Sequence, residues 1–317
     1  MGISYMPHED MAADGTWAAF TGSPSKQARR VVAGMRAVRA FANVVHLDVD
    51  VLLARVMESK SPPRRLRRQV EVTASEFGGM PIWTLRSASA LGAAGQYVVC
   101  LHGGGYIYEA TSVHWRNYAT LARDTGATLV VPIYPLAPKA SAATVVPTVA
   151  DLVSTLVSEH GAKRVSIYGD SAGGGLALAA AQELVRRGTT VPASMVLVSP
   201  WLDVTMTDPG ISEIDDPALS VAMLKDSGVQ WADDLDPRHP WVSPLFGSLD
   251  GLPSTVVYSG SLDLLCVDAI RLQANAIAQD ADITFVLRKG LIHDWAISPQ
   301  PEAVAVRPDI YRQLFVQ

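Results

Sequence analysis

Short apolar runs that recur along the chain constrain its fold more than any other feature. They are almost uninterrupted and lie at residues 97–101, 128–133, 164–168, 194–198, 255–258 and 283–287. A strand covered by helices on both faces has this continuous apolar character, whereas a strand with one solvated face alternates. The runs therefore predict buried strands of one sheet, and β-rich segments at 70–73 and 82–85 predict an opening pair of strands.

Stretches with apolar residues at helical spacing separate these runs and predict helices. They lie near residues 114–124, 147–159, 172–187, 265–279 and 302–315. Because strand and helix alternate, the sequence predicts an α/β fold, with a mostly parallel central sheet and helices on both faces. The chain has 317 residues, 49% of them apolar, which is enough to fill one sizeable core.

Two amphipathic helices are predicted ahead of the first strand, at 25–46 and 51–58. Pro62 and Pro63 end the second of them. A cluster of four arginines follows between Arg64 and Arg68. We interpret this cluster as a solvated linker and assign it no function.

The interval 205–241 interrupts the alternation of strand and helix. It is acidic and turn-rich, and it contains one predicted helix, with Asp216 as its N-cap and Pro217 in its first turn. We interpret the interval as an insertion over the strand ends.

Charge and cysteine content exclude several classes of function. The net charge is −5 and the pI is near 5.8, so we expect neither a nucleic acid nor an anionic membrane as partner. Cys100 and Cys266 both lie in apolar runs and suggest no disulfide, metal or cofactor site. The first 25 residues lack the apolar centre of a secretory signal, and no run approaches the ~18 apolar residues of a membrane span. We therefore expect a soluble, cytoplasmic protein and leave open a homodimer.

A glycine-flanked serine follows the predicted strand at 164–168. Gly169-Asp-Ser171-Ala-Gly173 stands between this strand and a predicted helix, which is the setting of a nucleophile elbow. In such an elbow a strained turn lifts the serine hydroxyl above the sheet. Ser171 is therefore the candidate nucleophile.

A run of three glycines, Gly103, Gly104 and Gly105, follows the predicted strand at 97–101. Acyl transfer builds negative charge on the carbonyl oxygen, and preorganised backbone N–H donors stabilise it. No Gly-Lys-Ser/Thr follows, so we interpret the glycines as an oxyanion loop and not as a phosphate cradle. His102 is expected to fix this loop by hydrogen bonding.

The elbow requires an acid and then a histidine after it in the chain. Of the histidines, only His239 and His293 follow the elbow, and His239 lies between prolines in the insertion. His293 comes just after the predicted strand at 283–287, in a loop where a general base is expected. We choose His293.

Three aspartates are candidates for the residue that orients His293. Asp263 comes directly after the predicted strand at 255–258, whereas Asp268 lies inside the following helix and should point away from the strand ends. Asp294 adjoins His293 in sequence and is not expected to reach back to its ring nitrogen. Asp263 is therefore assigned to accept the proton on one ring nitrogen and to steady the imidazolium.

At this point the sequence resembles the hormone-sensitive-lipase-like branch of the α/β-hydrolases, which contains bacterial carboxylesterases. The motifs that carry the resemblance span about residues 97–295: His102-Gly-Gly-Gly-Tyr106, Tyr134-Pro-Leu-Ala-Pro138, Gly169-Asp-Ser-Ala-Gly-Gly174, Ser199-Pro-Trp201 with Asp203, Ser243-Pro-Leu245, Gly251-Leu-Pro253, Gly260 to Asp263 with Leu265 and Asp268, and His293. The family's usual Tyr-Arg-Leu-Ala-Pro has Pro135 in place of arginine here.

The resemblance implies an α/β-hydrolase fold and a serine carboxylester hydrolase. It implies oxyanion donors at Gly104, Gly105 and Ala172. It also implies a cap, which matches residues 1–65 and 205–241, over a core formed by residues 66–204 and 242–317.

Alternatives remain open at this stage. A lactonase, acyltransferase or amidase would use the same residues. A non-catalytic receptor similar to the gibberellin receptor would have lost the histidine, which is present here as His293.

The expected substrate is a small-molecule ester with a short or medium acyl chain. Four aromatic residues lie near the motif loops and are candidates for the wall of a closed apolar pocket: Tyr106, Tyr108, Trp201 and Trp295.

Overall fold

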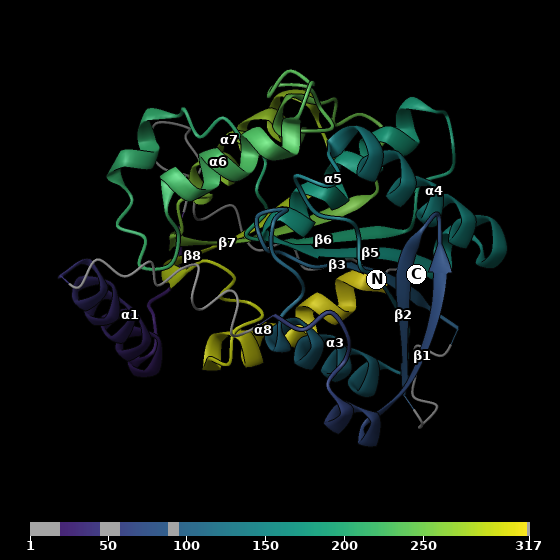
Figure 1. Ribbon diagram of the computed structural model, residues 1–317, viewed down its shortest axis with the longest axis horizontal. Helices are drawn as coiled ribbons and strands as arrows, with labels where there is room; N and C mark the ends of the chain where they lie inside the picture. Colours follow the sequence, from purple (N-terminus) through teal and green to yellow (C-terminus); the bar gives the residue numbers. More distant parts are fainter. Residues whose placement is uncertain (1–19, 45–57, 88–94, 316–317) are drawn as a thin grey trace.

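A single twisted sheet organises the part of the chain that the computed structural model describes, residues 20–44, 58–87 and 95–315 (Figure 1). Its strand order is β1-β2-β4-β3-β5-β6-β7-β8. The strands are β1 (Val70–Phe77), β2 (Met80–Ser87), β3 (Tyr97–Leu101), β4 (Thr128–Pro132), β5 (Val165–Asp170), β6 (Ser194–Val198), β7 (Ser254–Leu262) and β8 (Ile283–Ile292). β2 pairs antiparallel with β1 and β4, and the other neighbours pair in parallel. The predicted, mostly parallel sheet is confirmed.

Helices cover both faces of the sheet, as predicted. They are α1 (Lys26–Val44), α3 (Ser112–Thr125), α4 (Ala142–His160), α5 (Ser171–Arg186), α6 (Val221–Ala232), α7 (Cys266–Gln279) and α8 (Pro301–Leu314). Helices α4, α5 and α7 pack on one face, whereas α3 and α8 pack on the other (Figure 1).

The central strands are continuously apolar because both of their faces are buried. In β3, Val99 and Leu101 belong to the core under α4 and α5, and Val98 and Cys100 belong to the core under α3 and α8. Successive side chains of a strand point to opposite faces. Since both faces are covered, every one of these positions has to be apolar.

Two predicted helix starts are wrong. Helix α4 begins at Ala142 and contains Pro147 inside its second turn, instead of beginning near that proline. Helix α6 begins at Val221 with Ser220 as its N-cap. Asp216 instead accepts the N–H groups of Ala218 and Leu219 in a turn ahead of α6.

Helix α1 contacts the insertion across a long stretch of sequence. The Arg39 guanidinium donates to the carbonyl oxygens of Asp216, Ala218 and Leu219 at 2.9–3.1 Å. Arg36 pairs with Asp215 at 2.6 Å. The predicted helix at 51–58 lies outside the described residues, apart from its last position.

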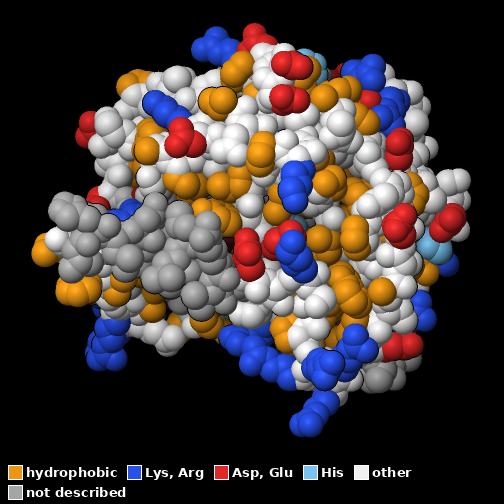
Figure 2. Space-filling view, in the orientation of Figure 1, with side chains coloured by type: hydrophobic (Ala, Val, Ile, Leu, Met, Phe, Trp, Pro, Cys, Tyr) orange, Lys and Arg blue, Asp and Glu red, His pale blue; other side chains and the backbone are white. Residues whose placement is uncertain are grey.

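The arginine cluster forms a short 3-10 helix, η2 (Arg64–Arg68). Leu66 is buried beneath it, while the four arginines are exposed. Lys and Arg side chains gather along the lower edge of the face in Figure 2, which otherwise mixes apolar, acidic and basic groups.

Among the helices in the described ranges, α4 is long and apolar enough to cross a membrane by length and composition. It packs against α5 and β5, and half of its apolar window is buried there. Core helices of globular proteins have the same composition.

Candidate active site

Ser171 lies at the junction between β5 and α5, at the carboxyl end of the central strands. Its φ angle of 52° is in the left-handed region, which a non-glycine residue rarely adopts. The following turn passes so close to β3 that a Cβ on Gly173 would stand 2.1 Å from the carbonyl oxygen of Leu101. This is the geometry of a strained strand-to-helix elbow, and it leaves the Ser171 side chain at the helix N-terminus.

The glycine loop after β3 is held from two sides. Tyr134 Oη donates to the carbonyl oxygen of His102 at 2.6 Å, and the Gly103 N–H donates to Asp170 Oδ2 at 2.9 Å. Gly104 has a φ of 125°, and a Cβ there would stand 2.5 Å from the carbonyl oxygen of Tyr108. The N–H of Gly103 is thus already bonded inside the protein, which leaves Gly104 and Gly105 as the candidate donors of this loop.

His102 supports the loop and is electrically neutral. Its Nδ1 lies 2.7 Å from the carbonyl oxygen of Gly103, and its ring stacks on Tyr134 with a centroid distance of 4.4 Å. Burial lowers the pKa of His102 to about 4. The expected structural role, and not a catalytic one, agrees with these contacts.

Sequence reasoning missed the buried pair Asp170–His114. Asp170 Oδ2 lies 2.9 Å from His114 Nε2, and the same oxygen accepts the Gly103 N–H. The pair therefore anchors the glycine loop to α3. The aspartate next to Ser171 was a signal, but its partner lies 56 positions away and only the fold brings it near.

His293 and Asp263 come together at the ends of β8 and β7. His293 Nδ1 lies 3.0 Å from Asp263 Oδ2, and Asp263 is fully buried. The other carboxylate oxygen of Asp263 accepts the Leu265 N–H at 2.9 Å. Both oxygens are therefore fixed, so the carboxylate can hold the imidazole in one orientation.

Two further carboxylates lie close to His293. Asp294 Oδ2 is 3.3 Å from His293 Nε2, so the expectation that Asp294 does not reach the ring is wrong. The reason is its left-handed backbone, with φ of 55°, which turns the side chain back toward the preceding residue. Asp216 accepts the Leu264 N–H at 2.8 Å, and burial and the Asp263 charge raise the pKa of Asp216 to about 6.

These charges set the protonation of His293. Burial alone would disfavour the imidazolium, but the charges of Asp294 and Asp263 outweigh burial and raise the pKa of His293 to about 10. Among the described residues, no hydrogen bond joins Ser171 Oγ to His293.

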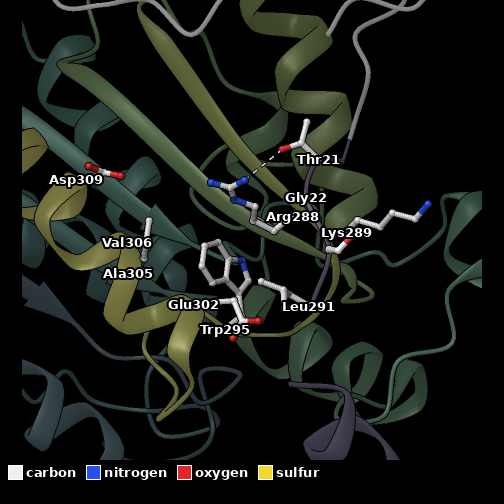
Figure 3. A pocket seen from close by; sticks show the side chains of 11 residues that line it. Thr21, Gly22, Arg288, Lys289, Leu291, Trp295, Glu302, Ala305, Val306 and Asp309 are labelled. Carbon is white, nitrogen blue, oxygen red and sulfur yellow. Dashed lines mark hydrogen bonds between the residues drawn. The ribbon is translucent and has the colours of Figure 1, made fainter. Parts of the chain in front are cut away.

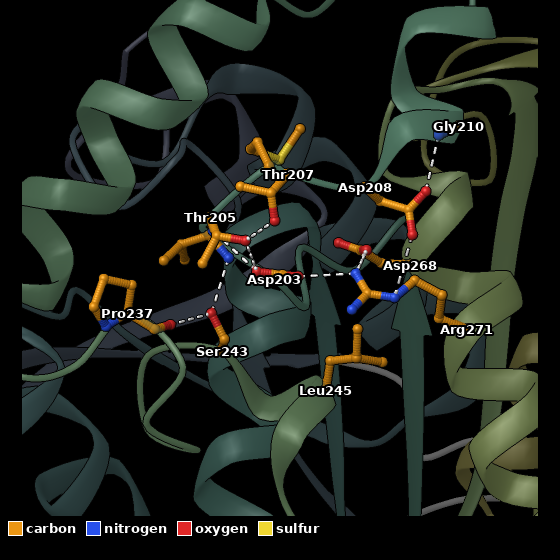
Figure 4. A network of polar contacts seen from close by, with 12 residues as sticks. Asp203, Thr205, Thr207, Asp208, Gly210, Pro237, Ser243, Leu245, Asp268 and Arg271 are labelled. Atoms are coloured by element: carbon orange, nitrogen blue, oxygen red, sulfur yellow. Dashed lines mark hydrogen bonds and ion pairs between the residues drawn. The ribbon is translucent and has the colours of Figure 1, made fainter.

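Asp268 takes part in a polar network at the base of the insertion, where it pairs with Arg271 (Figure 4). Arg271 Nη1 lies 2.9 Å from Asp268 and 2.8 Å from Asp203, and its Nε lies 3.6 Å from Asp208. Burial and the Asp203 charge raise the pKa of Asp268 to about 7. The network ties the start of the insertion to α7.

The four aromatic candidates do not share one wall. Tyr106 stacks on Trp231 at 3.9 Å and on Trp201 at 5.4 Å, and all three rings are buried. Tyr108 is partly exposed.

Trp295 belongs to the core on the opposite face of the sheet, under α8. Its indole lines a surface pocket of about 170 Å³, between Arg288 of β8 and Glu302 and Val306 of α8 (Figure 3). The structure thus separates Trp295 from Tyr106 and Trp201. Hydrogen-bonded turns at Asp294–Ser298 follow His293 directly and contain Trp295.

No group of three or more potential metal ligands occurs among the residues that the structure describes.

Comparisons with known proteins agree with this fold. Residues 98–297 match the protein family described as the alpha/beta hydrolase fold. A triacylglycerol lipase of Mycobacterium tuberculosis is 40% identical over 313 residues, which cover 93% of this chain and 67% of that protein. An esterase of Acinetobacter venetianus is 32% identical over 228 residues, covering 70% of this chain and 75% of the esterase. A hormone-sensitive lipase from a metagenome library has a similar structure, with a TM-score of 0.78 at 24% identity over 92% of this chain and 99% of that one.

Proposed function

Because the chain belongs to the α/β-hydrolase fold family and is an esterase- or lipase-type hydrolase, we propose that it cleaves carboxylic esters with Ser171 as nucleophile, His293 as general base and Asp263 as the group that orients the histidine. The observation that carries the proposal is the fixed contact of 3.0 Å between Asp263 and His293, in a chain whose Ser171 occupies a strained elbow. A hydrolase of this fold needs these three roles filled in the order serine, acid, histidine.

The reaction then follows in two steps. Ser171 Oγ attacks the ester carbonyl carbon while its proton moves to Nε2 of a neutral His293, and the imidazolium returns that proton to the departing alcohol. A water molecule, deprotonated by the same nitrogen, attacks the acyl-enzyme, the bond between the acyl carbon and Ser171 Oγ breaks, and the imidazolium returns the proton to Oγ as the acid leaves. Asp263 stays ionised throughout and stabilises the imidazolium.

The oxyanion of each tetrahedral intermediate needs backbone donors. We assign the N–H groups of Gly104, Gly105 and Ala172. Ala172 lies in the first turn of α5, where N–H groups have no intrahelical partner and the helix dipole favours negative charge. Gly103 has a different role, because its N–H bond to Asp170 holds the loop in place.

For the substrate, we propose short- to medium-chain acyl esters. Tyr106 and Trp201 are buried beside each other under the insertion and favour an enclosed apolar site, and Tyr108 is the partly exposed aromatic at its edge. Each buried methylene contributes about 0.8 kcal/mol, so efficiency should rise with acyl length until the site is full.

A long-chain lipase is the second candidate, favoured by the 40% identity to a triacylglycerol lipase. A nitrophenyl acyl series from two to sixteen carbons, assayed below and above the micelle threshold, separates the two. A maximum at short acyl chains without interfacial activation supports the esterase. Rates that rise through the palmitoyl ester and increase sharply at the interface would show the lipase instead.

A cytosolic location is part of the proposal. Cys100 and Cys266 are both free and buried, which agrees with a reducing compartment.

A further inference from the structure

A second carboxylate beside His293 has no role in the proposed mechanism. Asp294 Oδ2 lies 3.3 Å from Nε2, the nitrogen that has to accept the proton of Ser171. Asp263 occupies the other nitrogen, Nδ1, at 3.0 Å. The imidazole is thus bracketed by two carboxylates, and one of them contacts the nitrogen that has to accept the proton of the serine.

The backbone holds Asp294 in this position. Its N–H donates to Ser199 Oγ at 3.0 Å, and its carbonyl oxygen accepts the N–H groups of Ile297 and Ser298 at 3.1 and 3.2 Å. Its φ of 55° is in the left-handed region, which is uncommon outside glycine, and these hydrogen bonds hold the turn in that conformation. The orientation of the carboxylate is therefore built into the turn.

The two carboxylates hold the ring differently. The contact with Asp263 is both a hydrogen bond and an ion pair, whereas the contact with Asp294 is an ion pair alone. The second contact is strong only while the imidazole is charged. Once Nε2 loses its proton, the attraction to Asp294 disappears and the nitrogen can accept a proton from Ser171.

We propose that Asp294 is a positioning residue that competes with Ser171 for Nε2 of His293 and keeps the imidazole protonated in the resting enzyme. The inference rests on the proposed function, since it presupposes that His293 is the base. It assigns to Asp294 the control of the pH range in which this base becomes available.

The charges around His293 favour this resting state. Asp263 at the end of β7, Asp216 from the insertion and Asp294 itself all stabilise the imidazolium against the effect of burial. Behind Asp294 lie Asp170, whose charge raises the pKa of Asp294, and His114, the partner of Asp170. Burial raises the pKa of Asp294, whereas the charge of His293 lowers it.

The decisive variant is Asp294→Asn. Asparagine has the same shape and adopts the left-handed conformation readily, so the turn should be preserved while the charge is removed. An opposite charge at this distance shifts a pKa by about one to three units. The midpoint of the rise of kcat/KM with pH should therefore fall by about one unit or more, and activity on the acidic side of the wild-type midpoint should rise by about tenfold.

The matched control is Asp268→Asn, which removes another buried carboxylate that does not contact His293. Its midpoint should equal that of the wild type. The midpoint is the readout because a purely structural role for Asp294 would lower the rate at every pH without moving it. An unchanged midpoint in Asp294→Asn would overturn the inference.

A second measurement does not depend on turnover. In the Ser171→Ala background, NMR of labelled histidine should show the His293 imidazole titrating at lower pH when Asp294 is replaced by asparagine. Phosphonate labelling of the wild type distinguishes failure of the proposed function from failure of the role proposed for Asp294. A label on a serine other than Ser171 would refute the proposed function, whereas a label on Ser171 with unmoved titration would refute the role of Asp294 alone.

Discussion

Among the described residues, two Asp–His pairs of nearly equal length, each with a fully buried aspartate, lie in different parts of the active-site region. Asp170 Oδ2 is 2.9 Å from His114 Nε2, and Asp263 Oδ2 is 3.0 Å from His293 Nδ1. The two pairs differ in what their second ring nitrogen contacts. His114 Nδ1 accepts the backbone N–H of Thr111 at 2.8 Å, whereas His293 Nε2 faces the carboxylate of Asp294.

That difference decides which histidine can act as a base. The charge of Asp170 outweighs burial and raises the pKa of His114, but a protonated Nδ1 could not accept the Thr111 N–H. The backbone donor therefore fixes His114 as the neutral tautomer and uses both of its nitrogens inside the protein. His293 keeps one nitrogen for exchange of a proton. An Asp–His pair can therefore supply a general base only where the second ring nitrogen of the histidine is not already occupied by a backbone N–H group.

The largest effect is expected at Ser171, which follows Asp170 in sequence but should react through the other pair. Ser171→Ala should lower kcat by about 10⁴-fold or more, because only the oxyanion donors and substrate binding would remain. The variant should stay folded. A phosphonate should label Ser171 alone, and near-normal turnover of the alanine variant would contradict the assignment.

The second largest effect should come from the pair of Asp263 and His293. Asp263→Asn should lower kcat by about 10² to 10⁴, because the histidine would lose the acceptor that orients it. Asp268→Asn, in the network of Figure 4, should lower kcat much less. Equal losses in these two variants would show that the choice of Asp263 is wrong.

The third prediction concerns the pair of Asp170 and His114, and the quantity predicted is the free energy of unfolding. His114→Gln removes the acceptor for the Thr111 N–H while leaving a donor for Asp170, and breaking such a buried network costs about 3 kcal/mol. Urea unfolding should show this loss equally from pH 6 to pH 9, since His114 is held neutral.

The opposite outcome has a distinct signature. If His114 were charged, its raised pKa would contribute stability that is complete below about pH 6.5, the ordinary histidine value, and lost as the pH rises through the folded-state value. A loss of stability in His114→Gln that decreases toward alkaline pH would therefore show that His114 is charged and that the two pairs are more alike than we infer.

The smallest effect should come from Asp216, which lies near the pair of Asp263 and His293. Its pKa of about 6 is above the ordinary value, so its ionisation costs stability as the pH rises from 4 to 6. Asp216→Asn removes this cost. The stability of the variant relative to the wild type should increase by about 2 kcal/mol between pH 4 and pH 7, and a constant difference would mean that Asp216 is not strained by burial.

Strands buried on both faces were predictable from sequence alone. The predicted bounds of β3 and β6 agree with the structure at both ends, because both faces of these strands demand apolar residues. Strand β8 extends five residues beyond its apolar run, to Ile292. It lies at the edge of the sheet, where Arg288 and Lys289 can stay partly solvated within the ladder, so composition does not reveal its end.

The candidate site likewise has a part that was chosen from the sequence and a part that only the fold reveals. Sequence order and local motifs led to the choice of Ser171, Asp263 and His293, since each stands after a predicted strand and the carboxyl ends of parallel strands meet at one edge. The tertiary structure alone decided the rest. His114 reaches Asp170 across 56 positions, and Asp294 turns back onto His293 through a left-handed backbone angle that its sequence does not dictate. Sequence records which groups are present after each strand, whereas the protonation of a histidine depends on the groups that surround both ring nitrogens in space.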